Sequence, residues 1–332
     1  MFNEVLPNLY RIEVPLPNNP LKALNSYVFK APGKNLIIDT GMNREECSKV
    51  IFSALQELKV DLEKTDFFIT HMHADHSGLV AALATDASKV YCSQPDADII
   101  SSGGLWDTVL KGACENGFPE KELQIALEKH PGYKYASKGG IKFCIVNNGD
   151  VITIGDYHFE CVETPGHTMG HMCLYDPVKK ILLSGDHILE DITPNISLFT
   201  SEEGNPLQDY LESLDKIYNL DIELVLPGHR RVFTNSKERI NQLKHHHQER
   251  VDEIFFILKN GEANAYTIAS QMSWDIDCSS WEQFPIPQKW FATGEAIAHL
   301  RYLEEDGKIK RETKDGINIF YIDHFEQEKH KR

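Results

Sequence analysis

Residues 67–78 of the chain read FFITHMHADHSG, and this stretch decides how the rest is interpreted. Its apolar start predicts a buried strand. In an extended segment His71 and His73 project to the same side, so two imidazoles can approach one ion. Asp75 and His76 follow after the strand has ended, where a turn can direct them to a second point. Histidines scattered by chance in a polar loop are the alternative, but imidazole and carboxylate at this density are the usual ligand set of zinc.

Three later segments place a ligand-type residue directly after a predicted strand. His167 lies in TPGHT, Asp186 in SGDH and His229 in LPGH. An earlier segment, LIIDTG, places Asp39 at the end of another predicted strand. Taken with residues 71–76, these motifs resemble the H-x-H-x-D-H pattern and the later ligand motifs of the metallo-β-lactamase superfamily.

The resemblance implies a fold and an assignment of ligands. It implies an α/β protein whose residues 1–245 form a four-layer αββα sandwich, with a helical insertion at about 94–140. It also implies two metal ions, each held by three side chains, with one carboxylate bridging them and Asp39 supporting the site from outside. In that assignment the first ion is held by His71, His73 and His167, the second by Asp75, His76 and His229, and the bridge is Asp186.

The same assignment implies a hydrolytic reaction. Five imidazoles and two carboxylates suit zinc, and iron or manganese are alternatives. Two close cations can share a water whose pKa falls toward about 7, which supplies a bridging hydroxide at neutral pH. Asp75 would orient that hydroxide and Asp186 would hold the two ions together, so these two residues are the predicted catalytic carboxylates.

The composition is ordinary for a soluble globular protein. The chain has 332 residues, 41% of them hydrophobic and 25% charged, with a net charge of −16. This charge disfavours broad electrostatic attraction to nucleic acid. The first residues show no signal-peptide pattern, and no apolar stretch approaches the length of a membrane helix, so a cytoplasmic protein without membrane contact is expected. The seven dispersed cysteines predict no disulfide framework.

Hydrophobic periodicity predicts the remaining elements of the catalytic domain. Strands are expected at 9–14, 25–29, 36–39, 67–70, 90–92, 141–146, 151–154, 158–163, 172–175, 181–184 and 222–226. Helices are expected at 43–58, 79–84, 206–219 and 238–247, and within the insertion at 95–100, 105–116 and 120–128. Trp106, Phe118 and Tyr133 of the insertion are candidate substrate contacts, with packing of a helical lid as the alternative.

Residues 246–332 are expected to form a separate winged-helix-like domain. Helices are predicted at 251–258, 265–272 and 293–305, followed by a hairpin around Asp315-Gly316. From Arg250 onward the chain has 11 Lys and Arg against 15 Asp and Glu. Nucleic-acid binding is therefore not favoured for this domain, and packing against the catalytic domain or against a dimer partner is preferred.

Several other histidines are not expected to be metal ligands. His171 is expected to be a hydrogen-bond partner of a ligand, and His187 to be structural or to line the cleft. The run His245-His246-His247 cannot converge on one ion because consecutive side chains diverge by about 100° around a helix. A solvated helix face or an interdomain contact is expected there, and His299 is expected to be ordinary.

Three functions remain open. The first is a metal-dependent hydrolase of a small thioester, ester or lactone. The second is an endoribonuclease or other phosphodiesterase using the same metals. The third is a regulatory binding protein that keeps the fold. True β-lactamase activity is not expected, because the subclass of those enzymes with two zincs commonly has cysteine where Asp186 stands and is secreted.

Overall fold

A computed structural model of the chain describes residues 2–200 and 204–323. These residues form two compact units. The first holds residues up to 104, residues 131–194 and residues 212–240; the second holds residues 105–130, 195–211 and 241 onward. The division expected at residue 245 stays a prediction, and residues 324–332 of the expected C-terminal domain lie outside the described residues. Across the described ranges, no helix has the length and apolar character needed to span a membrane.

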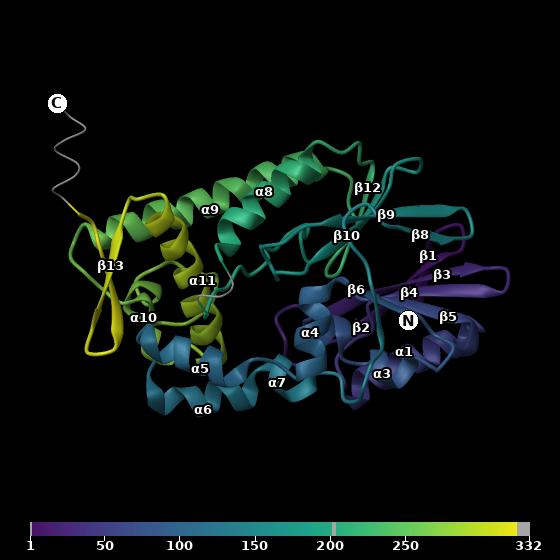
Figure 1. Ribbon diagram of the computed structural model, residues 1–332, viewed down its shortest axis with the longest axis horizontal. Coiled ribbons are helices and arrows are strands. Elements are labelled where there is room, and N and C mark those ends of the chain that lie inside the picture. Colours follow the sequence, from purple (N-terminus) through teal and green to yellow (C-terminus); the bar gives the residue numbers. More distant parts are fainter. Residues whose placement is uncertain (1, 201–203, 324–332) are drawn as a thin grey trace. The chain divides into compact units, whose positions relative to one another are not determined.

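The first unit is built on two mixed sheets (Figure 1). The larger sheet has its strands in sequence order; β1 to β4 pair antiparallel, and β4 to β7 pair parallel. Its strands are β1 (Phe2–Leu6), β2 (Leu9–Pro15), β3 (Ala23–Ala31), β4 (Lys34–Ile38), β5 (Thr65–Phe68), β6 (Val90–Cys92) and β7 (Phe143–Ile145). Of these, β1 was not among the predicted strands.

The smaller sheet has the order β12-β11-β10-β9-β8, with only β11 and β12 parallel. Its strands are β8 (Val151–Ile154), β9 (Tyr157–Glu163), β10 (Met172–Asp176), β11 (Ile181–Gly185) and β12 (Leu224–Pro227). The inner faces of the two sheets share one apolar core, in which the rings of Phe29 and Phe159 lie 5.2 Å apart, edge to face.

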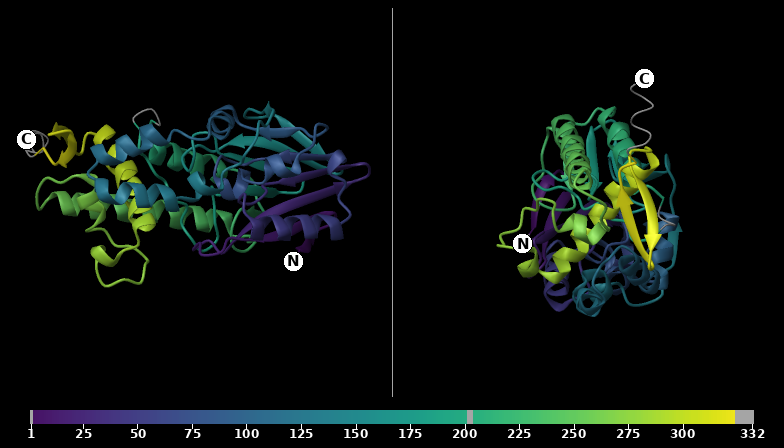
Figure 2. Two further views of the ribbon diagram at one scale, coloured as in Figure 1. Left: turned by 90° about the horizontal axis from the view of Figure 1, so that it is seen from below. Right: turned by 90° about the vertical axis from the view of Figure 1, so that its left-hand side faces the viewer.

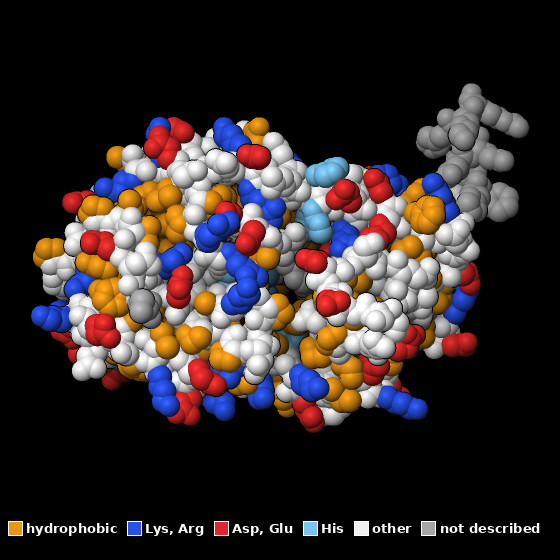
Figure 3. All heavy atoms as spheres, turned by 180° about the vertical axis from the view of Figure 1, so that it is seen from behind, with side chains coloured by type: hydrophobic (Ala, Val, Ile, Leu, Met, Phe, Trp, Pro, Cys, Tyr) orange, Lys and Arg blue, Asp and Glu red, His pale blue; other side chains and the backbone are white. Residues whose placement is uncertain are grey.

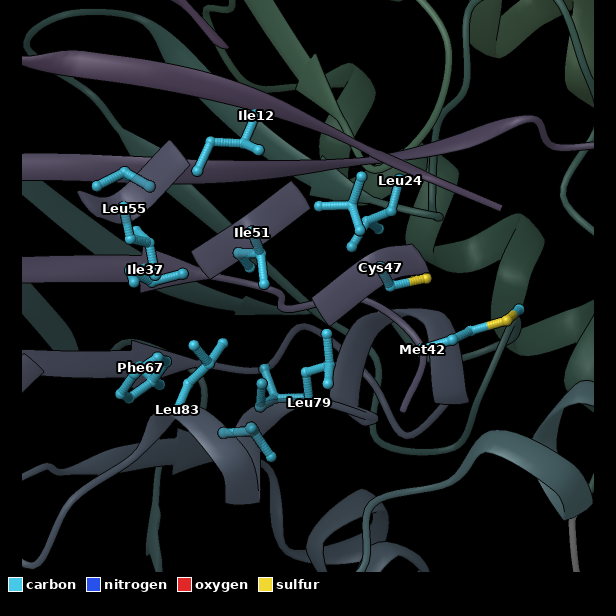
Figure 4. Packing of buried hydrophobic residues seen from close by; sticks show 14 of the residues in the cluster. Ile12, Leu24, Ile37, Met42, Cys47, Ile51, Leu55, Phe67, Leu79 and Leu83 are labelled. Carbon is cyan, nitrogen blue, oxygen red and sulfur yellow. The ribbon is translucent and has the colours of Figure 1, made fainter. Parts of the chain in front are cut away.

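Helices cover the outer face of the larger sheet. Helix α1 (Glu45–Glu57) buries Cys47, Ile51 and Leu55, which recur at the helical period and pack onto the sheet together with α3 (Val80–Leu83) (Figure 4). Two glutamates in the first turn of α1 suit the positive end of the helix dipole. With the second sheet behind, this arrangement supplies one helical layer and both sheets of the expected αββα sandwich.

Of the other helices, α2 (Ala74–Ser77) and α7 (Pro131–Tyr135) were not predicted, and the rest lie where helices were expected, with one clear correction. The rest are α4 (Gln94–Ser102), α5 (Trp106–Glu115), α6 (Glu120–Lys129), α8 (Pro206–Tyr218), α9 (Ser236–Leu258), α10 (Ala265–Ala269) and α11 (Ile286–Glu305). The two helices predicted at 238–247 and 251–258 are one continuous helix, α9. The prediction divided the helix because it placed a domain boundary between residues 245 and 246, which lie inside α9.

The second unit is organised around α11, which is buried from Lys289 to Leu300 except at the partly buried Phe291. The insertion helix α6 is fixed to it by an ion pair between Glu122 and the buried Lys289, 3.0 Å apart. The Phe118 ring lies against Trp290 of the same helix at 5.6 Å. The insertion therefore shares its core with the C-terminal residues of the chain.

A β-hairpin follows α11, formed by β13 (Lys310–Lys314) and β14 (Ile317–Tyr321) (Figure 2, yellow). Asp315 and Gly316 both have positive φ, 50° and 80°, which a two-residue turn with the twist of a hairpin requires. This confirms the predicted turn. A winged-helix architecture for the whole C-terminal region remains a prediction.

The four tryptophans of the chain all belong to the second unit, so their fluorescence reports its unfolding. Burial among Trp106, Trp290 and Phe291 lowers the pKa of His130 from 6.5 to about 4. As the pH falls, the His130 imidazole of the unfolded chain is protonated near pH 6.5, whereas that of the folded chain stays neutral until about pH 4. The free energy of unfolding that is present above pH 6.5 is therefore lost progressively toward pH 4. Between pH 7.5 and 5.5 we expect His130 to account for about 1 kcal/mol of lost stability.

Urea unfolding followed by tryptophan fluorescence at both pH values measures this loss. His130→Phe should reduce the loss, whereas His158→Phe, at an exposed position on β9, should leave it unchanged. An unaltered pH dependence in His130→Phe would contradict the assignment.

Candidate metal centre

Seven side chains of the predicted ligand set meet at one end of the two sheets. Those from the larger sheet follow β5 or lie in α2, and those from the smaller sheet follow β9, β11 and β12. The structure brings all seven together: His71, His73, Asp75, His76, His167, Asp186 and His229. Because β5 already ends at Phe68, the alternation of an extended strand does not explain how His71 and His73 converge; they lie in the bend after it.

The first group consists of His71, His73 and His167, whose ring nitrogens lie within 4.8 Å of one another. His71 Nε2 and His73 Nδ1 are 3.0 Å apart, so His73 presents the nitrogen nearer its backbone. Burial and the neighbouring imidazoles lower the pKa of His71 well below 6.5, and the pKa of His73 falls to about 3 for the same causes. Both rings are therefore neutral at pH 7, the form in which imidazole binds a metal.

The second group consists of Asp75, His76 and His229. His229 Nε2 lies 3.3 Å from His76 Nε2 and 3.4 Å from Asp75 Oδ2. Burial opposes charge on His229, but the carboxylates of Asp186 and Asp75 outweigh it and raise its pKa to about 10. Burial also acts to raise the pKa of Asp75, yet the hydrogen bond to His229 and the nearby imidazoles bring it to about 2.

Asp186 lies between the two groups. Its Oδ1 is 3.5 Å from His76 Nε2, and its Oδ2 is 3.6 Å from His167 Nε2 and 3.4 Å from His229 Nε2. One carboxylate thus reaches nitrogens of both groups, as a bridging ligand must.

The donor set fits metal ions in spacing and chemistry. A tetrahedral ion with ligands at 2.0–2.1 Å separates neighbouring donor atoms by about 3.3 Å. The donor pairs described above lie between 3.0 and 3.6 Å apart. Nitrogen and oxygen donors without a thiolate suit zinc and other first-row metals.

The far sides of several ligand rings are held by partners outside the ligand set. Asp39 accepts from the Thr70 backbone N–H and hydroxyl, and its Oδ2 lies 2.7 Å from His76 Nδ1. His229 Nδ1 donates to the Ala23 carbonyl at 2.7 Å. Such partners fix ring orientation and tautomer. Asp39 itself has φ of +58°, a conformation that directs its carboxylate into the site.

Gly228 is required by space next to His229. A Cβ there would lie 2.6 Å from Asp186 Oδ1 and 2.8 Å from His76 Cε1. The glycine of the LPGH segment therefore allows the strand end to approach the other ligands closely.

His171 behaves as expected for a partner of a ligand. Its Nε2 accepts from the Asp186 backbone N–H at 3.1 Å, and its Nδ1 contacts the Thr164 hydroxyl at 2.8 Å. His187 is fully buried, and burial lowers its pKa to about 3. Both histidines are structural.

Asp96 was not among the residues predicted for the site. It is fully buried in the first turn of α4 and accepts hydrogen bonds from Met72, Thr168 and Gly170. No motif surrounds it in the sequence. The available signal was its place after β6, a strand parallel to and beside β5, since such strand ends meet at one edge.

The candidate residues of the second unit need correction. Phe118 is buried against Tyr266 and Trp290, so it is a core residue and not a substrate contact. His247 and His299 are also buried, with His247 Nδ1 3.0 Å from His299 Nε2. Neither histidine is a solvated or ordinary surface residue.

The other insertion residues and histidines considered as candidates are exposed or only partly buried. Trp106 packs its ring 4.9 Å from His130, and Tyr133 is 52% exposed. In the histidine run, His245 is exposed and His246 is partly buried near Glu295.

Removal of the Asp186 carboxylate tests the predicted ligand assignment. Asp186→Ala should lose most of the bound metal, because donors of both groups lose their shared anionic ligand. His246→Ala, outside the site, should keep the wild-type metal content. Elemental analysis of both purified variants measures this, and a full metal complement in Asp186→Ala would refute the bridging role.

Comparisons with known proteins identify the family and the fold. Residues 21–229 match the family model described as the metallo-beta-lactamase superfamily, and residues 282–322 match a metallo-beta-lactamase-like C-terminal domain. The crystal structure of the metallo-beta-lactamase family protein TTHA1429 from Thermus thermophilus superposes with a TM-score of 0.79 at 25% identity. The match covers 96% of this chain and 100% of that one.

Curated relatives include enzymes of known reaction type. Human acyl-coenzyme A thioesterase MBLAC2 is 26% identical, over 63% of this chain and 74% of that protein. The atrochrysone carboxyl ACP thioesterase of Aspergillus fumigatus is 23% identical, over 79% and 72%. The probable metallo-hydrolase YqjP of Bacillus subtilis is 23% identical, over 82% and 85%. With a matching family model across most of its length and His and Asp clusters suited to metal, the chain belongs to the metallo-beta-lactamase superfamily and is one of its metallo-hydrolases.

Proposed function

We propose that the chain hydrolyses acyl thioesters with two divalent metal ions, zinc being favoured. The observation that carries the proposal is the convergence of seven imidazole and carboxylate donors on two adjacent points, with Asp186 reaching both. When bound, the metals would lower the pKa of water and polarise a carbonyl oxygen. His71, His73 and His167 would hold one ion, Asp75, His76 and His229 the other, and Asp186 would bridge them.

The thioester is preferred over the ester and lactone on two grounds. Two of the curated relatives named above are thioesterases, one for acyl-coenzyme A and one for an acyl carrier protein. A thiol with a pKa near 8.5 also leaves more easily at neutral pH than an alcohol does, so the reaction places little demand on a general acid. The residues of the candidate site supply bases and carboxylates, which suits such a leaving group.

Asp75 would position the attacking water. Its low pKa, about 2, keeps the carboxylate ionised at neutral pH. It can therefore accept a hydrogen bond from an attacking water and direct the oxygen lone pair at the thioester carbonyl carbon. The water oxygen bonds to the carbonyl carbon, the C–S bond breaks, one proton of the water passes to the departing thiolate and the other is released to solvent, so the products are a carboxylate and a thiol. His229, hydrogen-bonded to Ala23 on its far side, keeps Asp75 in place.

The alternative of RNA cleavage has weaker support, because the cationic side chains in and just before the C-terminal hairpin, Lys308, Lys310, Arg311 and Lys314, each pair with a carboxylate. Lys308 pairs with Asp306 at 2.7 Å, and Arg311 with Glu304 at 3.1 Å. Lys310 and Lys314 likewise have carboxylate partners: Asp323 for the first, and Glu262 and Glu312 for the second. On the face drawn in Figure 3, cationic and anionic side chains are intermingled, with no broad basic tract among the residues described there.

We propose that residues 1–245 form the catalytic domain and residues 246–332 a winged-helix-like domain that packs on it or on a second copy of the chain. A complete ligand set weighs against the regulatory alternative, since a binding protein has no need of all seven donors.

A substrate panel tests the reaction. Purified protein with measured metal content is offered an acyl-coenzyme A, an acyl-homoserine lactone and a single-stranded RNA, each with and without chelator. We expect chelator-sensitive release of thiol from the first. Cleavage of RNA in preference to the thioester would transfer the assignment to the phosphodiesterase alternative, and two bound metals with no turnover of any substrate would favour the regulatory one.

Met169 should affect the apolar part of the substrate. This side chain is 46% exposed and lies two residues after His167. Met169→Ser should raise KM for a medium-chain acyl thioester several-fold and leave kcat little changed, since each CH₂ removed from apolar contact is worth about 0.8 kcal/mol.

Steady-state kinetics with acetyl and octanoyl thioesters separate the effect of Met169. Val178→Ser is the matched control, because this side chain is 83% exposed in the turn between β10 and β11. Equal KM changes for the two chain lengths would remove Met169 from the substrate contacts.

A further inference from the structure

We infer that Asp96 is a positioning residue that sets the spacing of the His71, His73 and His167 group before a metal binds. Its Oδ2 accepts from the Met72 backbone N–H at 2.8 Å and from the Thr168 hydroxyl at 2.7 Å. Its Oδ1 accepts from the Gly170 backbone N–H at 3.0 Å. A single buried carboxylate thus holds the loop after β5 and the loop after β9.

The residues that donate hydrogen bonds to Asp96 lie next to or near the predicted ligands in the sequence. Met72 stands between His71 and His73, and Thr168 follows His167 directly. Two of the three hydrogen bonds come from backbone N–H groups, so they fix the course of the chain and not only a side-chain rotamer. The three imidazoles come from two loops that follow strands of different sheets, and Asp96 ties these loops together.

Asp96 packs tightly against Gly170. A Cβ at this position would lie 2.6 Å from Asp96 Oδ1 and closer still to Ser93 Oγ. Asp96 is also fully buried, so water does not compete for its oxygens. Loss of the carboxylate would remove the acceptor of the partly buried Met72 N–H and of the buried Gly170 N–H, which weakens the attachment of both loops.

The placement of Asp96 mirrors that of Asp39. Strands β4, β5 and β6 are adjacent and parallel. Asp39 follows β4 and holds Thr70 and His76, and Asp96 follows β6 and holds Met72. The ligand loop after β5 is therefore held from both sides. Asp39 contacts His76 of the second group directly and reaches His71 only through the Thr70 hydroxyl, whereas the hydrogen bonds of Asp96 all lie beside or near the ligands of the first group.

This division predicts selective loss of one metal. The inference rests on the proposed two-metal site but not on the thioester substrate, so its test measures binding. Metal-free protein is titrated with Co²⁺, and the visible absorption of the bound ion is recorded. Wild-type protein should bind two ions. Asp96→Ala should keep one binding step unchanged and weaken the other by about 10–100-fold, the usual cost of losing a partner that orients ligands.

Two further variants separate positioning from general damage. Asp98→Asn, at an exposed position on the same helix, should bind both ions as the wild type does. Asp96→Glu, which keeps the carboxylate, should recover part of the affinity that Asp96→Ala loses. The unfolding temperature of each metal-free variant is measured alongside.

The outcomes are distinguishable. If wild-type protein does not bind two ions, the proposed function fails. If it does, but Asp96→Ala binds both ions with wild-type affinity, only the inference about Asp96 fails. Equal weakening of both ions in Asp96→Ala also overturns the inference, because it would show a general structural role and no preference for the first group.

Discussion

The structure depends on the burial of ionisable groups at one edge of a sandwich. Imidazoles and carboxylates are costly to remove from water unless each has a partner, and an unpaired buried charge costs several kcal/mol. The chain meets this requirement by placing donors and acceptors in alternation: Asp39 against His76, Asp186 and Asp75 against His229, and the Ala23 carbonyl behind His229. The strand ends, the close glycines and the left-handed conformation of Asp39 all serve this arrangement.

Much of this was predictable because the signals are local or repeated. The density of ligand-type residues at 71–76 points to a metal site without any knowledge of the fold. The ligands at 167, 186 and 229 each follow an apolar run, so their position at a strand end can be predicted from periodicity. Parallel strands then bring such ends to one edge. The hairpin turn was predictable from a local signal as well, because an Asp-Gly pair favours the positive φ angles that Asp315 and Gly316 adopt.

What could not be predicted depends on partners far away in the sequence. Asp96 has no neighbouring motif, and its partners Thr168 and Gly170 lie 72 and 74 residues on. Helix α9 was divided because a domain boundary was expected inside it, and the burial of His247 against His299 of α11 could not be predicted from the helix's own sequence. In both cases a buried polar side chain finds a hydrogen-bond partner through tertiary structure, and hydrophobic periodicity contains no signal for such a contact.

The ion pair between Glu122 and Lys289 constrains the order in which the chain can fold. The two residues are 167 positions apart, yet they and the aromatic contacts of Phe118 join the insertion to α11. During synthesis the insertion helices emerge long before α11, so their apolar faces have no partner until nearly all of the described chain has been made. Consolidation of the second unit is therefore a late, non-local event, which favours slow folding and leaves this segment exposed to association with other nascent chains.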